Sequence, residues 1–122
     1  MSSLIPPECA TTARIDLTEG TGDEIVARVR PGRNDPVFAG HYPGFPLLPG
    51  VYIVEYVHRT VLAGMPAAVL TELVSCRFLQ TVDLDDELVI TVRRDGGLRR
   101  GTVTVAGGPA AEVVLRYQNG GE

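Results

Sequence analysis

Residues 40–60 read GHYPGFPLLPGVYIVEYVHRT, and this stretch decides what the rest of the chain must do. Its first part, 40–50, holds three glycines and three prolines, and the prolines are three residues apart. Proline fixes its own φ and disfavours helix in the residue before it, so we expect a stiff, extended loop. The second part predicts a helix over 51–63, ended by Gly64 and Pro66.

The predicted helix is apolar on nearly every side, which is typical of a helix buried in a protein or in a membrane. Its thirteen residues fall short of the roughly 20 that cross a bilayer, so no membrane span is expected. We therefore expect a helix buried inside the protein. Glu55 lies near its middle, although glutamate is rarely buried without a partner.

Two interpretations of Glu55 remain open from the residues alone. In the first, Glu55 forms an i,i+4 ion pair with Arg59 and the pair faces solvent through a gap. In the second, apolar neighbours keep Glu55 protonated, so that it can serve as an acid in catalysis. His41, at the start of the loop, is a candidate base, but a single histidine in a loop is more often a surface residue.

Alternation of apolar and polar residues predicts about six strands around this helix. They are expected at 11–18, 24–30, 67–81, 88–93, 101–106 and 110–117. Between them, 31–36 breaks the pattern and leads into the loop, and Asp95-Gly96-Gly97 is the clearest hairpin signal. One buried helix among strands joined by short hairpins predicts an α+β fold, with an antiparallel sheet wrapped round the helix. We expect one domain, 1–122.

Composition excludes several classes of protein. The 122 residues are 44% hydrophobic and 21% charged, which is ordinary for a globular domain, and the net charge of −4 argues against a nucleic-acid binder. Cys9 and Cys76 are too isolated for a disulfide framework or a zinc site, so neither a metal nor a cofactor is expected. The first ten residues do not resemble a signal peptide, and a cytoplasmic location is expected.

A long motif joins the loop to the helix: NDPVFAGHYPG at 34–44, then Pro46, Pro49-Gly50-Val51 and Glu55. It resembles the active-site segment of the hot dog-fold 3-hydroxyacyl-acyl carrier protein dehydratases, in which the histidine and the acidic residue are also fourteen positions apart. A looser similarity runs through 76–88 and 103–112. The resemblance implies a hot dog fold and an obligate dimer, with the histidine and the acidic residue of each site supplied by opposite subunits.

The resemblance also implies a role for each residue of the motif. His41 is the base that takes the C2 proton, and Glu55 is the acid that protonates the departing C3 hydroxyl. The helix N-terminus carries unpaired N–H groups, which makes Pro49, Gly50 and Val51 the oxyanion and substrate-binding segment. Pro49 has no N–H, so Gly50 is the expected donor, and its missing side chain lets the thioester carbonyl come close.

The chain departs from the family just after the acidic residue. Small residues are usual there, with a glutamine one turn on, whereas this chain has Tyr56, Val57, His58 and Arg59. Arg59 in that position can pair with Glu55 and weaken it as an acid. Tyr52 is a second candidate modulator.

The implied activity is dehydration of 3-hydroxyacyl thioesters, carried on acyl carrier protein or coenzyme A, to trans-2-enoyl thioesters. The N-terminal block of the housekeeping enzymes has no counterpart in 5–15, so a specialised fatty-acid, polyketide or polyene pathway is expected. A hot dog acyl thioesterase and a non-catalytic partner subunit of a heterodimeric dehydratase remain alternatives. Arg93-Arg94 and Arg99-Arg100 form either a solvated hairpin end or a docking patch for an acidic carrier protein.

Overall fold

The computed structural model describes residues 13–20, 23–32, 35–41 and 47–118, with only the backbone described at residues 19 and 39–41. The elements, in chain order, are β1 (Asp16–Gly20), β2 (Glu24–Val29), α1 (Pro36–His41), α2 (Gly50–Gly64), β3 (Val69–Phe78), β4 (Leu88–Asp95), β5 (Leu98–Val105) and β6 (Gly108–Gln118). No helix among these residues is long and apolar enough to cross a membrane.

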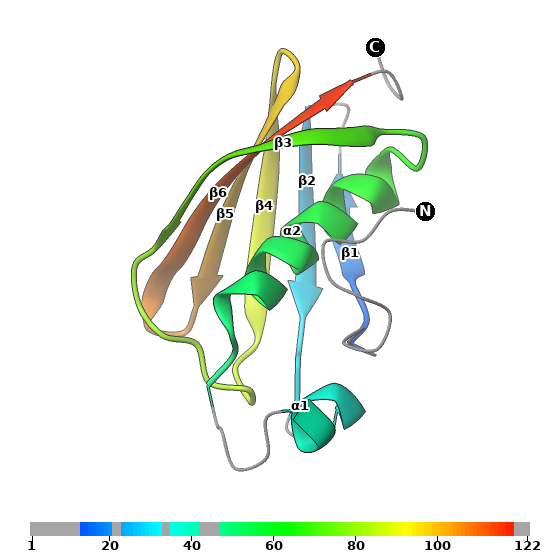
Figure 1. The fold of residues 1–122 in the computed structure, drawn as a ribbon. Helices are drawn as coiled ribbons and strands as arrows, with labels where there is room; N and C mark the ends of the chain where they lie inside the picture. Colours follow the sequence, from blue (N-terminus) through cyan, green and yellow to red (C-terminus); the bar gives the residue numbers. More distant parts are fainter. Residues whose placement is uncertain (1–12, 21–22, 33–34, 42–46, 119–122) are drawn as a thin grey trace.

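The strands form one antiparallel sheet in the order β1-β2-β4-β5-β6-β3. The sheet curves so that α2 lies against its inner face, and β3 returns across the end of the molecule to pair with β6 (Figure 1). The predicted α+β fold, with six strands around one main helix, is confirmed.

The predicted central helix is also confirmed, with its ends within one residue of the expected positions. Nine residues of α2 are buried, on all sides of the helix: Tyr52, Ile53, Val54, Glu55, Tyr56, Val57, His58, Thr60 and Val61. The helix packs closely on Gly101 of β5, where a Cβ atom would lie 2.7 Å from Cγ1 of Val57. A small residue in β5 therefore lets the helix pack directly on the strand.

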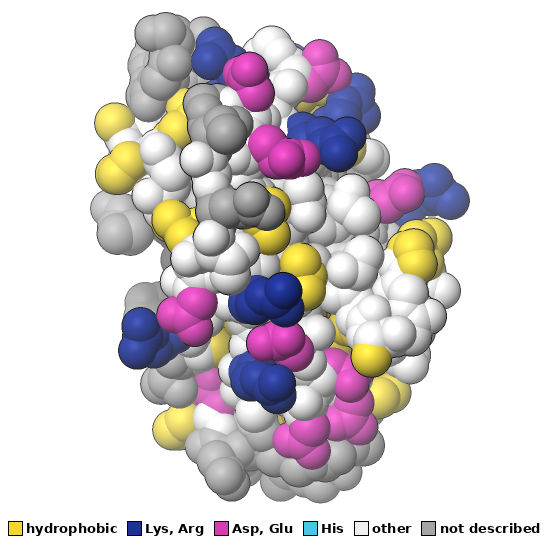
Figure 2. All heavy atoms as spheres, turned by 180° about the vertical axis from the view of Figure 1, so that it is seen from behind, with side chains coloured by type: hydrophobic (Ala, Val, Ile, Leu, Met, Phe, Trp, Pro, Cys, Tyr) yellow, Lys and Arg dark blue, Asp and Glu magenta, His cyan; other side chains and the backbone are white. Residues whose placement is uncertain are grey.

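The outer face of the sheet is charged and balanced. Figure 2 shows arginine and acidic side chains lying next to one another across the face turned away from α2. Ion pairs join outward-facing side chains of the sheet and of the turn before β4: Arg28–Glu87 at 3.0 Å, Arg93–Glu24 at 2.8 Å, Arg100–Asp95 at 2.8 Å and Arg77–Glu112 at 3.1 Å. Such exposed pairs contribute little to stability, and they make this face polar.

Helix α1 lies where the sequence predicted only a break and a loop, so that part of the prediction is wrong. The carboxylate of Asp35 accepts a hydrogen bond from the Val37 amide at 3.0 Å, and Pro36 occupies the first helical position. A side-chain N-cap followed by proline is a strong helix start, and here it outweighs the glycine at position 40. Residues 42–46 of the expected stiff loop lie outside the described residues.

The end of that loop is extended, as predicted. Pro49 has φ −63° and ψ 142°, and Leu47 forms an antiparallel bridge with Asp83. The Leu48 amide donates a hydrogen bond to the Val82 carbonyl at 2.7 Å. The segment that enters α2 is thus attached to the segment that follows β3.

The strand predictions differ in accuracy. The hairpin at 95–97 is confirmed, with Gly96 at φ 60° between β4 and β5. The first strand is displaced, because β1 covers Asp16–Gly20 rather than 11–18, and residues 11 and 12 lie outside the described part. The β1–β2 ladder has a register shift between Leu17 and Glu19 and continues to Gly20, which pairs with Ile25.

We predict that Gly101→Ala lowers the free energy of unfolding by about 1–3 kcal/mol, because the new methyl group overlaps Val57 in a closely packed core. Chemical denaturation measures this change. Gly97→Ala is the matched control, since its Cβ would lie 3.6 Å from the Tyr117 carbonyl oxygen, an ordinary contact. A Gly101→Ala protein as stable as the control would contradict this account of the helix–sheet contact.

Candidate active site

The two predicted catalytic residues lie on the two helices. Glu55 is in the second turn of α2, and His41 is the last residue of α1. The structure describes the backbone of His41 but not its side chain, so its role as a base stays a prediction. The two helices are in contact, because the rings of Phe38 and Tyr52 pack edge to face with centroids 5.1 Å apart. Tyr52, the candidate modulator, therefore holds α1 against α2.

Glu55 forms the ion pair of the first interpretation. Arg59 Nε donates to Glu55 Oε2 at 2.6 Å, one helical turn along α2. The Glu55 side chain is 1% exposed and the Arg59 side chain 27% exposed, so the arginine is the member of the pair that reaches the surface. A buried carboxylate held by a charge-assisted hydrogen bond is strongly fixed in position.

In the described part of the chain, the N-terminus of α2 has no side-chain cap, as an oxyanion site requires, and its first turn carries no acidic residue. The N-terminal N–H groups and the positive end of the helix dipole are therefore not neutralised locally. Val51 is exposed on this turn, and the Tyr52 amide already donates to the Pro49 carbonyl at 3.0 Å. Gly50 and Val51 remain the predicted donors.

A cavity of about 380 Å³ begins at this helix end. Its lining residues are Leu48, Gly50, Ile53, Phe78, Leu79, Gln80, Thr81 and Val82. Most of them are apolar, and the volume lies within the range of small-molecule pockets. Sequence analysis had not singled out Phe78 or the segment after it as part of the site. The arrangement places an apolar cavity beside a helix N-terminus that can stabilise negative charge.

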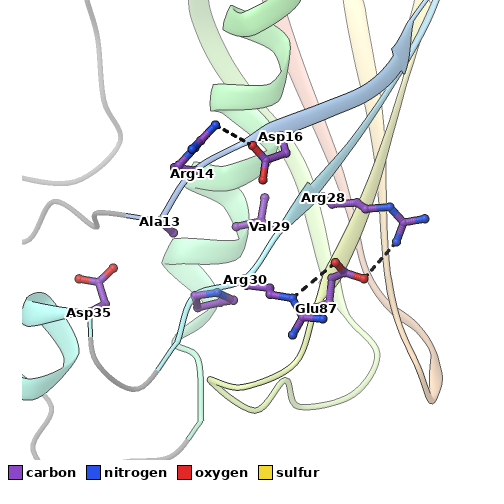
Figure 3. A pocket seen from close by; sticks show the side chains of 9 residues that line it. Ala13, Arg14, Asp16, Arg28, Val29, Arg30, Asp35 and Glu87 are labelled. Carbon is purple, nitrogen blue, oxygen red and sulfur yellow. Dashed lines mark hydrogen bonds and ion pairs between the residues drawn. The ribbon is translucent and has the colours of Figure 1, made fainter.

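A larger hollow, of about 470 Å³, lies elsewhere. It is lined by residues before and at the start of β1, at and after the end of β2, before α1 and just before β4, and Figure 3 shows their side chains. Its charged groups pair with one another: Arg28 and Arg30 both contact Glu87, at 3.0 and 3.6 Å, and Arg14 contacts Asp16 at 3.3 Å. It shares no residue with the cavity at α2, and we do not assign the chemistry to it.

A buried polar cluster beside α2 was missed by the sequence analysis. Tyr117 of β6 and His58 of α2 are hydrogen-bonded through the phenol oxygen and Nδ1 at 2.6 Å, and their rings stack with centroids 5.8 Å apart. Burial raises the pKa of Tyr117, the Arg99 charge opposes this shift, and the Glu55 charge adds to it. A histidine three positions after Glu55, inside an apolar helix, was the available signal.

Arg99 belongs to this cluster and corrects the expectation of a surface patch at 93–100. It is only 4% exposed, and its guanidinium donates to the carbonyls of Gly96 and Leu98 at 3.0 and 2.9 Å and to Met65 Sδ at 3.1 Å. Alternation along β5 turns Arg99 inward and Arg100 outward, as the burial pattern of the strand shows. Only part of the arginine cluster is thus available to a partner.

Comparison with known proteins gives a consistent match. The family model of ApeI-like proteins, described as ApeI dehydratase, matches residues 17–107. A protein of Enterococcus faecalis named 3-hydroxyacyl-[acyl-carrier-protein] dehydratase FabZ is 33% identical over 112 residues, covering 81% of this chain and 79% of that protein. A protein of the same name in Thermotoga petrophila is 36% identical over 114 residues, covering 88% of this chain and 81% of that protein.

Solved structures share the fold. The dehydratase heterocomplex ApeI:P from Xenorhabdus doucetiae matches with a TM-score of 0.74 and 16% sequence identity, over 98% of this chain and 100% of that chain. An uncharacterised protein from Erwinia carotovora matches with a TM-score of 0.70 and 14% sequence identity, over 89% of this chain and 96% of that chain. The hot dog arrangement implied by the sequence motif is confirmed.

We predict that Tyr117→Phe lowers the free energy of unfolding near pH 7 by about 1–3 kcal/mol, because the variant loses the buried hydrogen bond to His58 while keeping the ring. Denaturation at several pH values also tests the raised pKa of Tyr117. Above about pH 10 the unfolded chain releases the phenol proton and the folded protein retains it, so wild-type stability falls as the pH rises.

The Tyr117→Phe variant lacks this ionisable group. It should therefore lose less stability than the wild type between neutral and strongly alkaline pH. Parallel curves of stability against pH for the two proteins would contradict the assignment.

Proposed function

Because the chain belongs to the ApeI-like dehydratase family, a family of hydro-lyases, we propose that it removes water from 3-hydroxyacyl thioesters carried on acyl carrier protein and yields trans-2-enoyl thioesters. The observation that carries this proposal is the placement of a buried carboxylate, Glu55, on the same helix as an uncapped N-terminus beside an apolar cavity. The names of the FabZ relatives supply the substrate class.

The proposed mechanism uses both the N-terminus of α2 and the carboxyl group of Glu55. The thioester oxygen accepts hydrogen bonds from the first turn of α2, where the helix dipole stabilises the negative charge that develops as C2 loses its proton to His41. The C3–O bond breaks, and Glu55 gives its proton to the hydroxyl, which leaves as water. Gly50 and Glu55 are five positions apart, about 7.5 Å along the helix axis, so one short substrate segment can reach both groups.

Arg59 sets a condition on this mechanism. An acid must carry a proton, whereas an arginine ion pair stabilises the carboxylate without one. This contact therefore favours a second candidate function, in which the chain is one subunit of a dehydratase made of two different hot dog chains. The match to the fold of a dehydratase heterocomplex agrees with that candidate.

Either candidate needs a second subunit, and β3 is the proposed contact. No strand in the described part of the chain pairs with the outer edge of β3. Large hydrophobic side chains on and just after this strand are exposed: Val69, Leu73, Val74, Phe78 and Leu79. An unpaired, apolar edge strand is a site for adding another strand. We place the partner's β3 there, in a homodimer or a heterodimer, with a specialised fatty-acid, polyketide or polyene pathway as the setting.

Incubation with a panel of 3-hydroxyacyl thioesters, read by mass spectrometry, tests the function. We predict loss of one water from the acyl group by the wild type, and a loss of rate of at least about 100-fold in both His41→Ala and Glu55→Gln, since each removes a proton-transfer group. Glu72→Gln is the matched control, because Glu72 is an exposed carboxylate on β3 paired with Arg116 at 3.0 Å. Release of the free acyl group instead of water would show a thioesterase.

The Arg59 contact gives a separate prediction. We expect the pH–rate profile of Arg59→Gln to differ from that of the wild type, because the variant removes the charged partner of the Glu55 carboxylate. Arg93→Gln, which changes an exposed arginine paired with Glu24, is the control and should leave the profile unchanged. The same profile in both variants would mean that Arg59 does not govern Glu55.

A further inference from the structure

The space in front of Gly50 is filled by a side chain of the same protein. A Cβ atom built on Gly50 would lie 2.8, 3.0 and 3.2 Å from Cζ, Cε2 and Cε1 of Phe78. The tip of the ring therefore rests against the backbone of the first residue of α2. Gly50 does not have a positive φ. The close approach of the Phe78 ring, rather than the backbone conformation, therefore explains why this position holds a glycine.

The backbone around Phe78 is fixed on both sides. Phe78 pairs with Ala111 in the β3–β6 ladder, and the Leu79 amide donates to the Ala110 carbonyl at 2.8 Å. Further along the cavity wall, Gln80 Nε2 donates to the Pro109 carbonyl at 2.8 Å. A ligand at the end of α2 therefore cannot move this wall as a whole. The Phe78 side chain, which is 49% exposed on this chain, is the group that can rotate.

The position of the ring joins two parts of the site. On one side it covers the N-terminus of α2, and on the other it lines the apolar cavity together with Leu48, Ile53 and Val82. A thioester whose carbonyl binds at Gly50 and whose acyl chain enters this cavity must pass Phe78. The ring therefore lies between Gly50 and the part of the cavity that a longer acyl chain has to reach.

We propose that Phe78 is a specificity-determining residue, whose ring must turn away from Gly50 before the thioester binds and whose size limits the acyl groups that the cavity accepts. The proposal rests on the proposed function and names the substrate feature that the site selects, the bulk and length of an apolar acyl chain. Phe78 touches the substrate without transferring a proton, so its effect is on the choice of substrate.

The test compares Phe78→Ala and Phe78→Leu with the wild type across acyl thioesters of increasing chain length. We expect kcat/KM for the longest chains to rise at least about tenfold relative to the shortest in Phe78→Ala, because pocket contacts of this size discriminate by roughly 10- to 200-fold. Phe78→Leu should lie between. Leu17→Ala is the matched control, since it removes an exposed hydrophobic side chain of β1 that neither lines the cavity nor lies on β3.

A binding measurement separates this proposal from the proposed function. Calorimetry with saturated acyl-pantetheine thioesters, which have no hydroxyl to lose, reports selection by chain length even if the protein turns over no substrate. The preference of Phe78→Ala for longer chains should shift in the same direction. Equal changes for all chain lengths, or the same profile as Leu17→Ala, would overturn the proposal.

A second pair of variants tests the contact itself. Gly50→Ala should lower the melting temperature, because the new methyl group meets the ring. In the Phe78→Ala background the same change should cost less, since the overlapping ring is gone. Equal costs in the two backgrounds would show that the ring does not rest on Gly50.

Discussion

α2 is apolar on nearly all of its sides, and a flat sheet can cover only one side of such a helix. The sheet curves around the helix, and nine residues between Tyr52 and Val61 are buried. Gly101 permits close contact between the helix and β5. The first turn of α2 projects toward the end of the sheet, where Phe78 and the cavity meet it. Burial of the body of the helix thus leaves its N-terminus as the place where chemistry can occur.

The same burial explains why Glu55 is held so firmly. A carboxylate inside an apolar helix must have a partner, and Arg59 provides one from the next turn while reaching the surface itself. The cluster of His58, Tyr117 and Arg99 satisfies the other polar groups nearby. No buried side-chain polar atom in the described residues lacks a hydrogen-bond partner. This rigidity favours precise placement of Glu55.

The sequence predicted the features that depend on local pattern. The limits of α2, the hairpin at Gly96 and the Glu55–Arg59 contact all follow from helical spacing and turn chemistry. It did not predict α1, because proline and asparagine near the start of this helix are also typical of a loop. The hydrogen bond by which Asp35 caps α1 is seen only in the three-dimensional structure. The inward turn of Arg99 and the contact of Phe78 with Gly50 depend on strand register and on packing between distant segments. The pattern of apolar and polar residues in the sequence does not predict these two features.

In the proposed site, Glu55 of one subunit works with His41 of the other. Refolding an equal mixture of inactive His41→Ala and inactive Glu55→Gln proteins tests it most directly. In a twofold-symmetric dimer each mixed pair has one site with both defects and one site with neither, so activity should return to about a quarter of the wild-type level. Native mass spectrometry shows whether mixed dimers have formed. A mixture that contains them and stays inactive would contradict the shared site.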